Sequence, residues 1–309
     1  MSKIHRGILL ALSTAFISGI ANFIAKIGVT VADPLVHTAL RVSTVALALT
    51  LLMHHKHGLF SVTQLSSKNK LKLLAIGLVG GSVPFMLFFV GLTKTTALTA
   101  ALIHKTLYIW VAFLAIFFLK EKITFKQMLG YTVVLWGNLF LFQKAEFKFA
   151  VGELMILSAT ILWAIENVVA KSALSEVKPI VVAWARLTIG AIVITTIALL
   201  MGKGELLMSL TAPQIVTIAA GATTLFFYVV TWYTALSLAP ATLVAALLVP
   251  ATLITNVLTG VFITHAFTFP QVIHGVLVIL GVGIIVYFSR RVQVSFGKMA
   301  KEHVAKRPS

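Results

Sequence analysis

Residues 152–171, GELMILSATILWAIENVVAK, decide the fold of this chain, because they repeat residues 7–26, GILLALSTAFISGIANFIAK, at an offset of 145 positions. Eight of the twenty aligned positions are identical, and the same offset carries Pro34 onto Pro179. This pattern indicates an internal duplication. One polar residue departs from it, since Glu166 stands where the first copy has Ala21. A carboxylate added to an apolar helix predicts a functional role.

The composition indicates a membrane protein. Of 309 residues, 59% are hydrophobic and only 11% are charged. Apolar runs of about 20 residues recur along the chain, which is the length that crosses a bilayer as a helix. We therefore predict an all-α polytopic membrane protein. Its ten expected spans are 7–29, 34–53, 71–92, 96–119, 126–142, 150–172, 179–201, 213–235, 240–263 and 270–288.

The distribution of Lys and Arg predicts the orientation of these spans. Sixteen lie on the side that holds both termini and four on the other, namely Lys94, Lys144, Lys148 and Lys203. We expect both termini to be cytoplasmic and the protein to lie in the cell (inner) membrane. The net charge of +17 is explained by this topology and by a basic tail at 291–309 that contacts anionic headgroups, so no nucleic-acid partner is expected.

Each copy of the repeat holds five spans. Because five is odd, the second copy enters the membrane from the opposite side, so the repeats at 1–145 and 146–290 are inverted. Inverted repeats are typical of secondary transporters, in which two halves enclose a site near the midplane and expose it alternately to each side.

The chain resembles the drug/metabolite transporter superfamily, EamA type. The resemblance rests on ten helices in two five-helix units, each opening with a helix that ends N-x-x-x-K and followed by a P-x6-R helix. A further similar feature is the end of the fourth span, where Glu121 is acidic but its counterpart is His265. The resemblance implies export or exchange of small organic solutes by alternating access, without ATP hydrolysis.

Polar residues present in both halves are candidates for the shared scaffold. Asn22 and Asn167 each precede a Lys by four residues, Lys26 and Lys171, which places each pair on one helix face. The other symmetric pair is Arg41 and Arg186. Each Lys lies near a helix end, where its long stem can snorkel, so the Asn–Lys pairs are candidates either for the scaffold or for the substrate site. The two arginines are candidates either for binding backbone carbonyls between helices or for binding an anionic solute.

Polar residues present in only one half are the sharper candidates for substrate binding or coupling. In the fourth span His104, Lys105 and Tyr108 follow helical spacing and are expected to line a cavity on one face. Counting about 1.5 Å per residue places Lys105 near the midplane and within partial reach of Glu166. The two are therefore candidate partners, either as a neutralising pair or as a site for solute or proton.

Aromatic residues and helix breakers complete the predicted site. Trp163 lies three residues before Glu166, where it can pack on an organic solute. Other aromatics that could line the same space are Trp110, Phe226, Tyr228, Trp232 and Tyr233. Pro84, in the stretch Gly80–Pro84, and Pro250 fall inside spans and are candidate gating positions.

Other functions have weaker support. The chain has no P-loop, dinucleotide, H-E-x-x-H or G-x-S-x-G motif, so we expect no enzyme activity and no cofactor. His54, His55 and His57 imitate a metal site, but no Cys or carboxylate lies nearby and no metal is expected. The predicted function is a secondary transporter for a small organic metabolite, with an amino acid or organic anion favoured and a proton as candidate coupling ion. The alternative is a membrane enzyme or scaffold.

Overall fold

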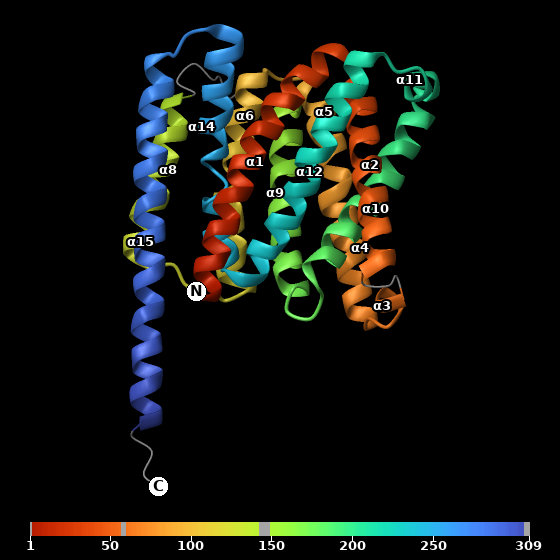
Figure 1. Cartoon of the computed structure of the whole chain (residues 1–309). Helices are drawn as coiled ribbons and strands as arrows, with labels where there is room; N and C mark the ends of the chain where they lie inside the picture. Colours follow the sequence, from red (N-terminus) through yellow and green to blue (C-terminus); the bar gives the residue numbers. More distant parts are fainter. Residues whose placement is uncertain (1, 57–59, 142–148, 306–309) are drawn as a thin grey trace.

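The computed structural model describes residues 2–56, 60–141 and 149–305, and in these ranges the chain is helical (Figure 1). The helices are α1 (Lys3–Val31), α2 (Pro34–Lys56), α3 (Phe60–Thr63), α4 (Ser67–Gly81), α5 (Val83–Leu92), α6 (Ala97–Lys105), α7 (Leu107–Phe118), α8 (Phe125–Leu141), α9 (Val151–Ala173), α10 (Pro179–Leu200), α11 (Gly204–Met208), α12 (Ala212–Leu238), α13 (Ala241–Ala246), α14 (Ala251–Thr259), the π-helical η1 (Gly260–Thr264) and α15 (Phe269–Ala305).

The predicted fold class is confirmed. Within the described ranges, nine helical segments are long and apolar enough to cross a membrane, and each overlaps an expected span. The remaining expected span, 126–142, coincides with α8, whose described part is 17 residues long. The tenth span continues without interruption as α15 beyond residue 288. His57, Lys148 and Ser309 lie outside the described residues.

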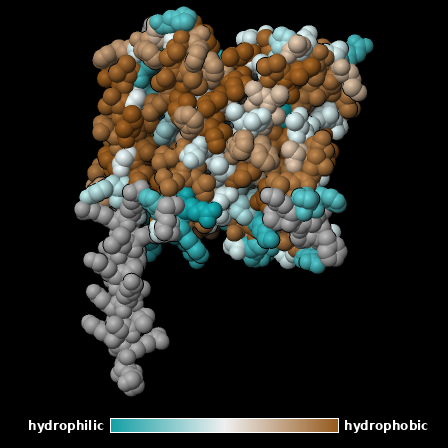
Figure 2. All heavy atoms as spheres, in the orientation of Figure 1, coloured by the Kyte–Doolittle hydropathy of each residue, from teal (hydrophilic) through white to brown (hydrophobic). Residues whose placement is uncertain are grey.

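The outer surface explains why these helices need a bilayer. Figure 2 shows one face of the protein, which is largely hydrophobic between its upper and lower rims, where most of the hydrophilic residues in this view gather. Large apolar side chains on this surface are exposed, among them Trp136 at 63% and Leu200 at 82%. An apolar surface this extensive would be unfavourable in water and is satisfied by lipid.

The two halves pack with pseudo-twofold symmetry. Helix α1 packs along α12 and α14, and its counterpart α9 packs along α5 and α7. These two groups are joined by two helix pairs, α2 with α10 and α8 with α15, which lie at opposite sides of the protein (Figure 1). The start of α1 and the projecting end of α15 lie at the same face, which we call the terminal face.

Three spans are interrupted. The third is divided at Ser82 into α4 and α5, and the ninth at 247–250 into α13 and α14, as Pro84 and Pro250 predicted. The fourth is divided at Thr106, which no helix breaker had indicated. Thr106 lies 144 residues before Pro250, so this break is the counterpart of the break in the second half.

An ion pair fixes the start of α2 at the opposite face. Asp33 Oδ1 accepts hydrogen bonds from the backbone N–H groups of Leu35 and Val36, and its carboxylate pairs with Lys203. Burial raises the pKa of Asp33, but Lys203 and the backbone donors outweigh it and hold the pKa below its usual 3.8. The carboxylate therefore stabilises the fold above about pH 4.

We expect Asp33→Asn to lower the free energy of unfolding by about 1 kcal/mol at neutral pH, because the ion pair is lost. The difference from wild type should disappear as the pH falls below the pKa of Asp33, where the wild-type carboxyl is also neutral. Thermal unfolding in detergent between pH 3 and 7 measures this difference. A difference that stays constant over the whole pH range would contradict the assignment.

Candidate functional site

Glu166 lies in a buried polar cluster between α4, α9, α10 and α12. Its side chain is 1% exposed. The Tyr233 hydroxyl donates to Glu166 Oε1 at 2.6 Å, and Arg186 Nη1 donates to the same hydroxyl at 3.2 Å. Arg186 Nη1 also lies 4.0 Å from Glu166 Oε2. Tyr233 thus bridges the carboxylate and the guanidinium, and no residue in the described part of the chain donates a hydrogen bond to Glu166 Oε2.

The break in the third span supplies a backbone acceptor to this cluster. In a continuous helix the carbonyl of Gly80 would accept from the N–H of residue 84, but Pro84 has none. The Gly80 carbonyl instead accepts from Trp163 Nε1 at 3.1 Å and, more weakly, from Arg186 Nη2 at 3.4 Å. Glycine is required here, since a Cβ would lie 2.3 Å from Glu166 Cγ.

Aromatic rings close one side of the cluster. The Trp163 ring contacts Phe85, Phe88 and His104, with centroid distances of 5.2, 5.7 and 5.0 Å. Tyr228 and Trp232 stack with centroids 6.0 Å apart on α12, the helix that also carries Tyr233. Trp163 therefore lies beside Glu166, where sequence spacing predicted it, but its N–H is bound to backbone.

The structure corrects the predicted partner of Glu166. The carboxylate faces Arg186, whereas Lys105 takes part in no ion pair among the described residues. The predicted common face of His104, Lys105 and Tyr108 is also wrong, because the break at Thr106 divides the helix. His104 contacts Trp163, Lys105 lines a separate cavity, and Tyr108 is buried against Tyr131.

The two symmetric Asn–Lys pairs have different surroundings. Asn167 is 4% exposed and donates to the Trp163 carbonyl at 2.8 Å, while Asn22 is exposed. Lys171 Nζ donates to the carbonyls of Leu236 and Ala239, each at 2.7 Å, whereas Lys26 is exposed. Asn167 and Lys171 in the second half are therefore held by backbone contacts near the terminal face, whereas Asn22 and Lys26 in the first half are exposed near the opposite face.

The two arginines also differ. Arg186 binds Tyr233 and the Gly80 carbonyl. Arg41 packs its stem on Gly221, where a Cβ would lie 2.9 Å from Arg41 Cδ. Its Nε is buried and has no hydrogen-bond partner among the residues that the structure describes. The carbonyl-binding interpretation thus fits Arg186 in part and does not fit Arg41.

Glu121 stabilises the start of α13 at the terminal face. Its Oε1 accepts from the Ala241 N–H at 2.7 Å, and its Oε2 accepts from the Thr242 N–H and hydroxyl at 3.0 and 2.8 Å. A carboxylate at a helix N-terminus satisfies free N–H groups and the helix dipole. Glu121 and Lys171 together hold the turn between α12 and α13. We call these two residues, with their hydrogen bonds to that turn, the terminal-face latch.

The sequence pattern of the EamA-like transporter family matches this chain twice, at residues 5–143 and 150–287. The chain belongs to the EamA-like transporter family. It is accordingly a multi-pass membrane transporter.

Named relatives of this EamA-like protein agree with that assignment. It is 22% identical over 231 residues to an uncharacterized transporter of Methanothermobacter thermautotrophicus, a match that covers 73% of this chain and 67% of the relative. It is 27% identical over 142 residues to the uncharacterized transporter YyaM of Bacillus subtilis, covering 44% of this chain and 47% of that protein. The chain thus spans about half the length of YyaM.

A solved crystal structure has the same fold as this EamA-like protein. The two superpose with a TM-score of 0.76 over 93% of this chain and 98% of the other, at 18% sequence identity. At this identity the similarity concerns the fold alone.

Two polar residues escaped the sequence-based prediction. Asn138 on α8 and His274 on α15 are 2% and 0% exposed, and Asn138 Oδ1 lies 3.3 Å from His274 Nε2. The signal was present, since each is a lone polar residue within an apolar run. It was not used because neither residue belongs to a repeated motif.

Proposed function

We propose that this protein is a secondary transporter that exports or exchanges a small organic metabolite, and that Glu166 and Arg186 form its substrate and coupling site. The favoured solute is an amino acid, with an organic anion as the second candidate. The observation that carries the proposal is the free Oε2 of Glu166, buried beside Arg186 at a helix break. Broken helices in inverted-repeat transporters line the substrate site.

The charges of the cluster suit a zwitterionic solute. The oxygen Oε2 of Glu166 can accept a hydrogen bond from a solute ammonium group, and Arg186 can bind a carboxylate. A proton would compete with the ammonium group for the same oxygen. Competition between solute and proton for one carboxylate produces antiport, in which protons that move down an inward gradient would drive export of the solute.

The cations of the interior also favour a solute with an anionic group. Among the described residues, neither Arg41 nor Lys105 has a carboxylate partner, while Glu166 is matched by Arg186. Uncompensated cations inside a membrane protein are costly, at roughly 3 kcal/mol each on insertion scales. An organic anion or the carboxylate of an amino acid would reduce that cost.

The unequal ends of the protein support alternating access. At the terminal face α13 packs against α7 and the latch of Glu121 and Lys171 is formed. At the opposite face the counterparts His265 and Lys26 are exposed. We infer a conformation closed at the terminal face, and a second conformation in which the closed and open ends are exchanged.

The orientation in the membrane is part of the proposal. We expect reporters at Ser2 and Ser309 to be cytoplasmic and a reporter at Lys148 to be exterior, because Lys and Arg concentrate in loops on the terminal face. Fusions to an enzyme that is active on one side of the cell membrane measure this. Termini on opposite sides would remove the inverted-repeat argument, and both termini outside would reverse the direction of every step above.

The substrate is tested by a metabolite-resolved efflux and uptake screen in cells that express the protein, compared with cells that express Arg186→Ala. We expect an amino acid or organic acid to move faster with the wild-type protein and to lose that advantage in the variant. Lys26→Ala, an exposed cation on α1, is the matched control and should retain some transport. If no solute distinguishes wild type from Arg186→Ala while both proteins are present in the membrane, a membrane enzyme or scaffold is favoured.

A further inference from the structure

The break at Pro250 lies beside an apolar groove of about 460 Å³ between α1 and α15. We call it the Pro250 groove, and it is lined by Leu12 of α1, by Pro250, and by one face of α15 from Ile279 to Tyr287. Helix α15 packs closely on α8, where a Cβ on Gly281 would lie 2.8 Å from the Gly130 carbonyl oxygen. At Gly283, which lines the groove, an added Cβ would meet no atom of the described chain within 4 Å. The close packing on α8 thus leaves open space on another face of α15.

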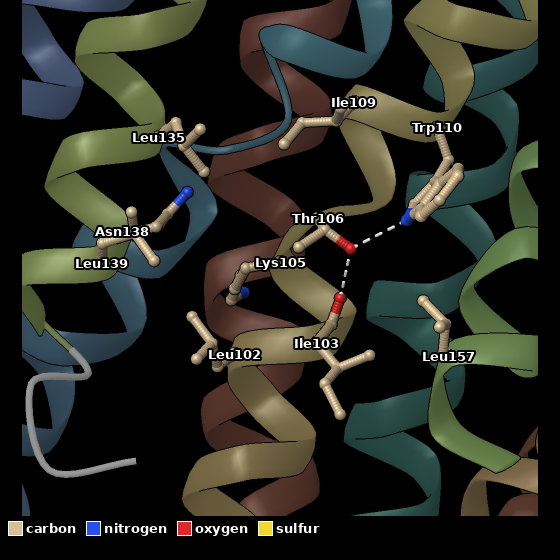
Figure 3. Close-up of a pocket in the computed structure, with 10 residues that line it drawn as sticks. All are labelled: Leu102, Ile103, Lys105, Thr106, Ile109, Trp110, Leu135, Asn138, Leu139 and Leu157. Atoms are coloured by element: carbon tan, nitrogen blue, oxygen red, sulfur yellow. Dashed lines mark hydrogen bonds between the residues drawn. The ribbon is translucent and has the colours of Figure 1, made fainter. Parts of the chain in front are cut away.

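The groove has a repeat-related counterpart in the first half. Figure 3 shows a cavity of about 290 Å³ at the break of the fourth span, where Thr106 is the counterpart of Pro250. The correspondence continues along the walls, at Leu135 and Ile279, Leu139 and Gly283, and Leu157 and Leu12. Leu139 contributes a side chain to the first cavity, whereas Gly283 contributes none to the groove, which is the larger of the two.

The groove is continuous with the lipid-exposed surface of the protein. Ile279 and Tyr287 are 64% and 50% exposed, and both line the groove. Ile279 lies at the middle of the span Phe269–Ser289, and α15 runs from there towards the terminal face (Figure 1). The eight-residue rise from Ile279 to Tyr287 is about 12 Å, close to the hydrocarbon depth of one leaflet, which is half of roughly 30 Å. The groove therefore has the depth and length of one lipid chain.

The chemistry of the lining selects a hydrocarbon occupant. The residues that line the groove carry no charge, and Tyr287 is the only one of them with a polar side-chain atom. A polar solute would lose its hydration there without gaining a partner, at a considerable cost. At about 30 Å³ per water-sized group, the volume has room for roughly fifteen methylene groups.

We propose that the Pro250 groove holds one acyl chain of an anionic phospholipid from the leaflet at the terminal face. Exposed cations lie at that end of the two flanking helices. Lys3 and Arg6 are exposed at the start of α1, and the Lys126 ammonium lies 5.3 Å from the ring centre of Phe288, the neighbour of Tyr287. Such cations attract anionic headgroups. Because the chain would pack beside Pro250, the bound lipid stabilises this conformation of the broken span. Binding of the lipid does not depend on the function proposed for Glu166.

Photocrosslinking in a bilayer of known composition tests the groove. The protein is placed in nanodiscs that contain phosphatidylglycerol with a diazirine in its acyl chain, and mass spectrometry locates the labelled residues. We expect Val282 and Val286 in the groove to be labelled more strongly than Trp136 and Leu200, which are exposed apolar residues outside it. Phosphatidylcholine with the same diazirine should label the groove more weakly.

Gly283→Leu gives the groove the side chain that Leu139 supplies to the related cavity. It should lower labelling of the groove by about tenfold, because displacing even two buried methylene groups changes occupancy by that factor. Gly283→Ala is the matched control, since it also replaces glycine within the helix but leaves most of the groove open, and it should be labelled like wild type. Both variants should fold, because the described chain leaves space for a Cβ at this position.

Labelling of the groove that is unchanged in Gly283→Leu, or no stronger than at Trp136 and Leu200, would overturn the proposal. Equal labelling by phosphatidylcholine would overturn the choice of an anionic headgroup. A second copy of the chain is the competing occupant, and Gly283→Cys tests it because the chain has no other Cys. Disulfide-linked dimers of Gly283→Cys, found where lipid labelling is absent, would assign the groove to that copy and contradict lipid binding.

Discussion

Arg186→Met is expected to destabilise the protein severely, because it leaves the Glu166 carboxylate buried at 1% exposure without a cation. Breaking a buried ion pair on one side costs about 3–5 kcal/mol. The double variant Arg186→Met/Glu166→Gln removes both charges and should recover a large part of that loss. Thermal unfolding and the yield of monodisperse protein after extraction measure both effects.

Arg41→Met is the matched control for this experiment, since Arg41 occupies the related position in the first half but has no carboxylate partner among the described residues. Its substitution should cost less, and combining it with Glu166→Gln should give additive losses. If the losses from Arg186→Met and Glu166→Gln also add, the two residues do not act as a pair.

Lys171→Met is expected to open the terminal face. The variant loses two charged hydrogen bonds, one to the carbonyl of Leu236 in the last turn of α12 and one to the carbonyl of Ala239, the residue that follows the helix. Such bonds are worth about 1.5–3 kcal/mol each. The ratio of the closed to the open conformation should therefore fall by roughly tenfold or more. The chain contains no Cys, so a single Cys introduced at Ala239, which is 2% exposed, can report the change.

A membrane-impermeant maleimide applied from the terminal face should label Ala239→Cys slowly in the otherwise wild-type protein and at least tenfold faster with Lys171→Met. Lys26→Met provides the matched control, because Lys26 is the counterpart of Lys171 in the first half and is exposed near the opposite face. Equal labelling rates in the two variants would show that Lys171 does not hold this end closed.

The sequence was sufficient to locate the helical spans and the repeat, because span length follows from bilayer thickness and the 145-residue offset from duplication. It also located the breaks at Pro84 and Pro250, since proline removes a backbone donor. The break at Thr106 was missed because Thr is compatible with a helix. At the break α6 packs against α9, α7 packs against α9 and α13, and the Thr106 hydroxyl donates to the Ile103 carbonyl.

The candidate site was predicted in part. Glu166 was found because it departs from the repeat, and Trp163 was found because it lies on the same helix face as Glu166. The partner of Glu166 was not found, because depth along two helices does not fix their rotation. Arg186 approaches through the gap that Gly80 leaves, a contact between residues 106 positions apart. Glu121 was recognised only as an acidic residue at the end of the fourth span, and its role at α13 depends equally on long-range packing.

The central claim is that Glu166 couples solute movement to a proton, and proton-driven transport by Glu166→Gln tests it most directly. The protein is placed in liposomes with the solute that the screen identifies, and exchange of solute for solute is compared with accumulation driven by a pH gradient. We predict that Glu166→Gln retains exchange and loses gradient-driven accumulation, because a neutral amide permits the conformational change but carries no proton. Accumulation at the wild-type level in Glu166→Gln would contradict the account.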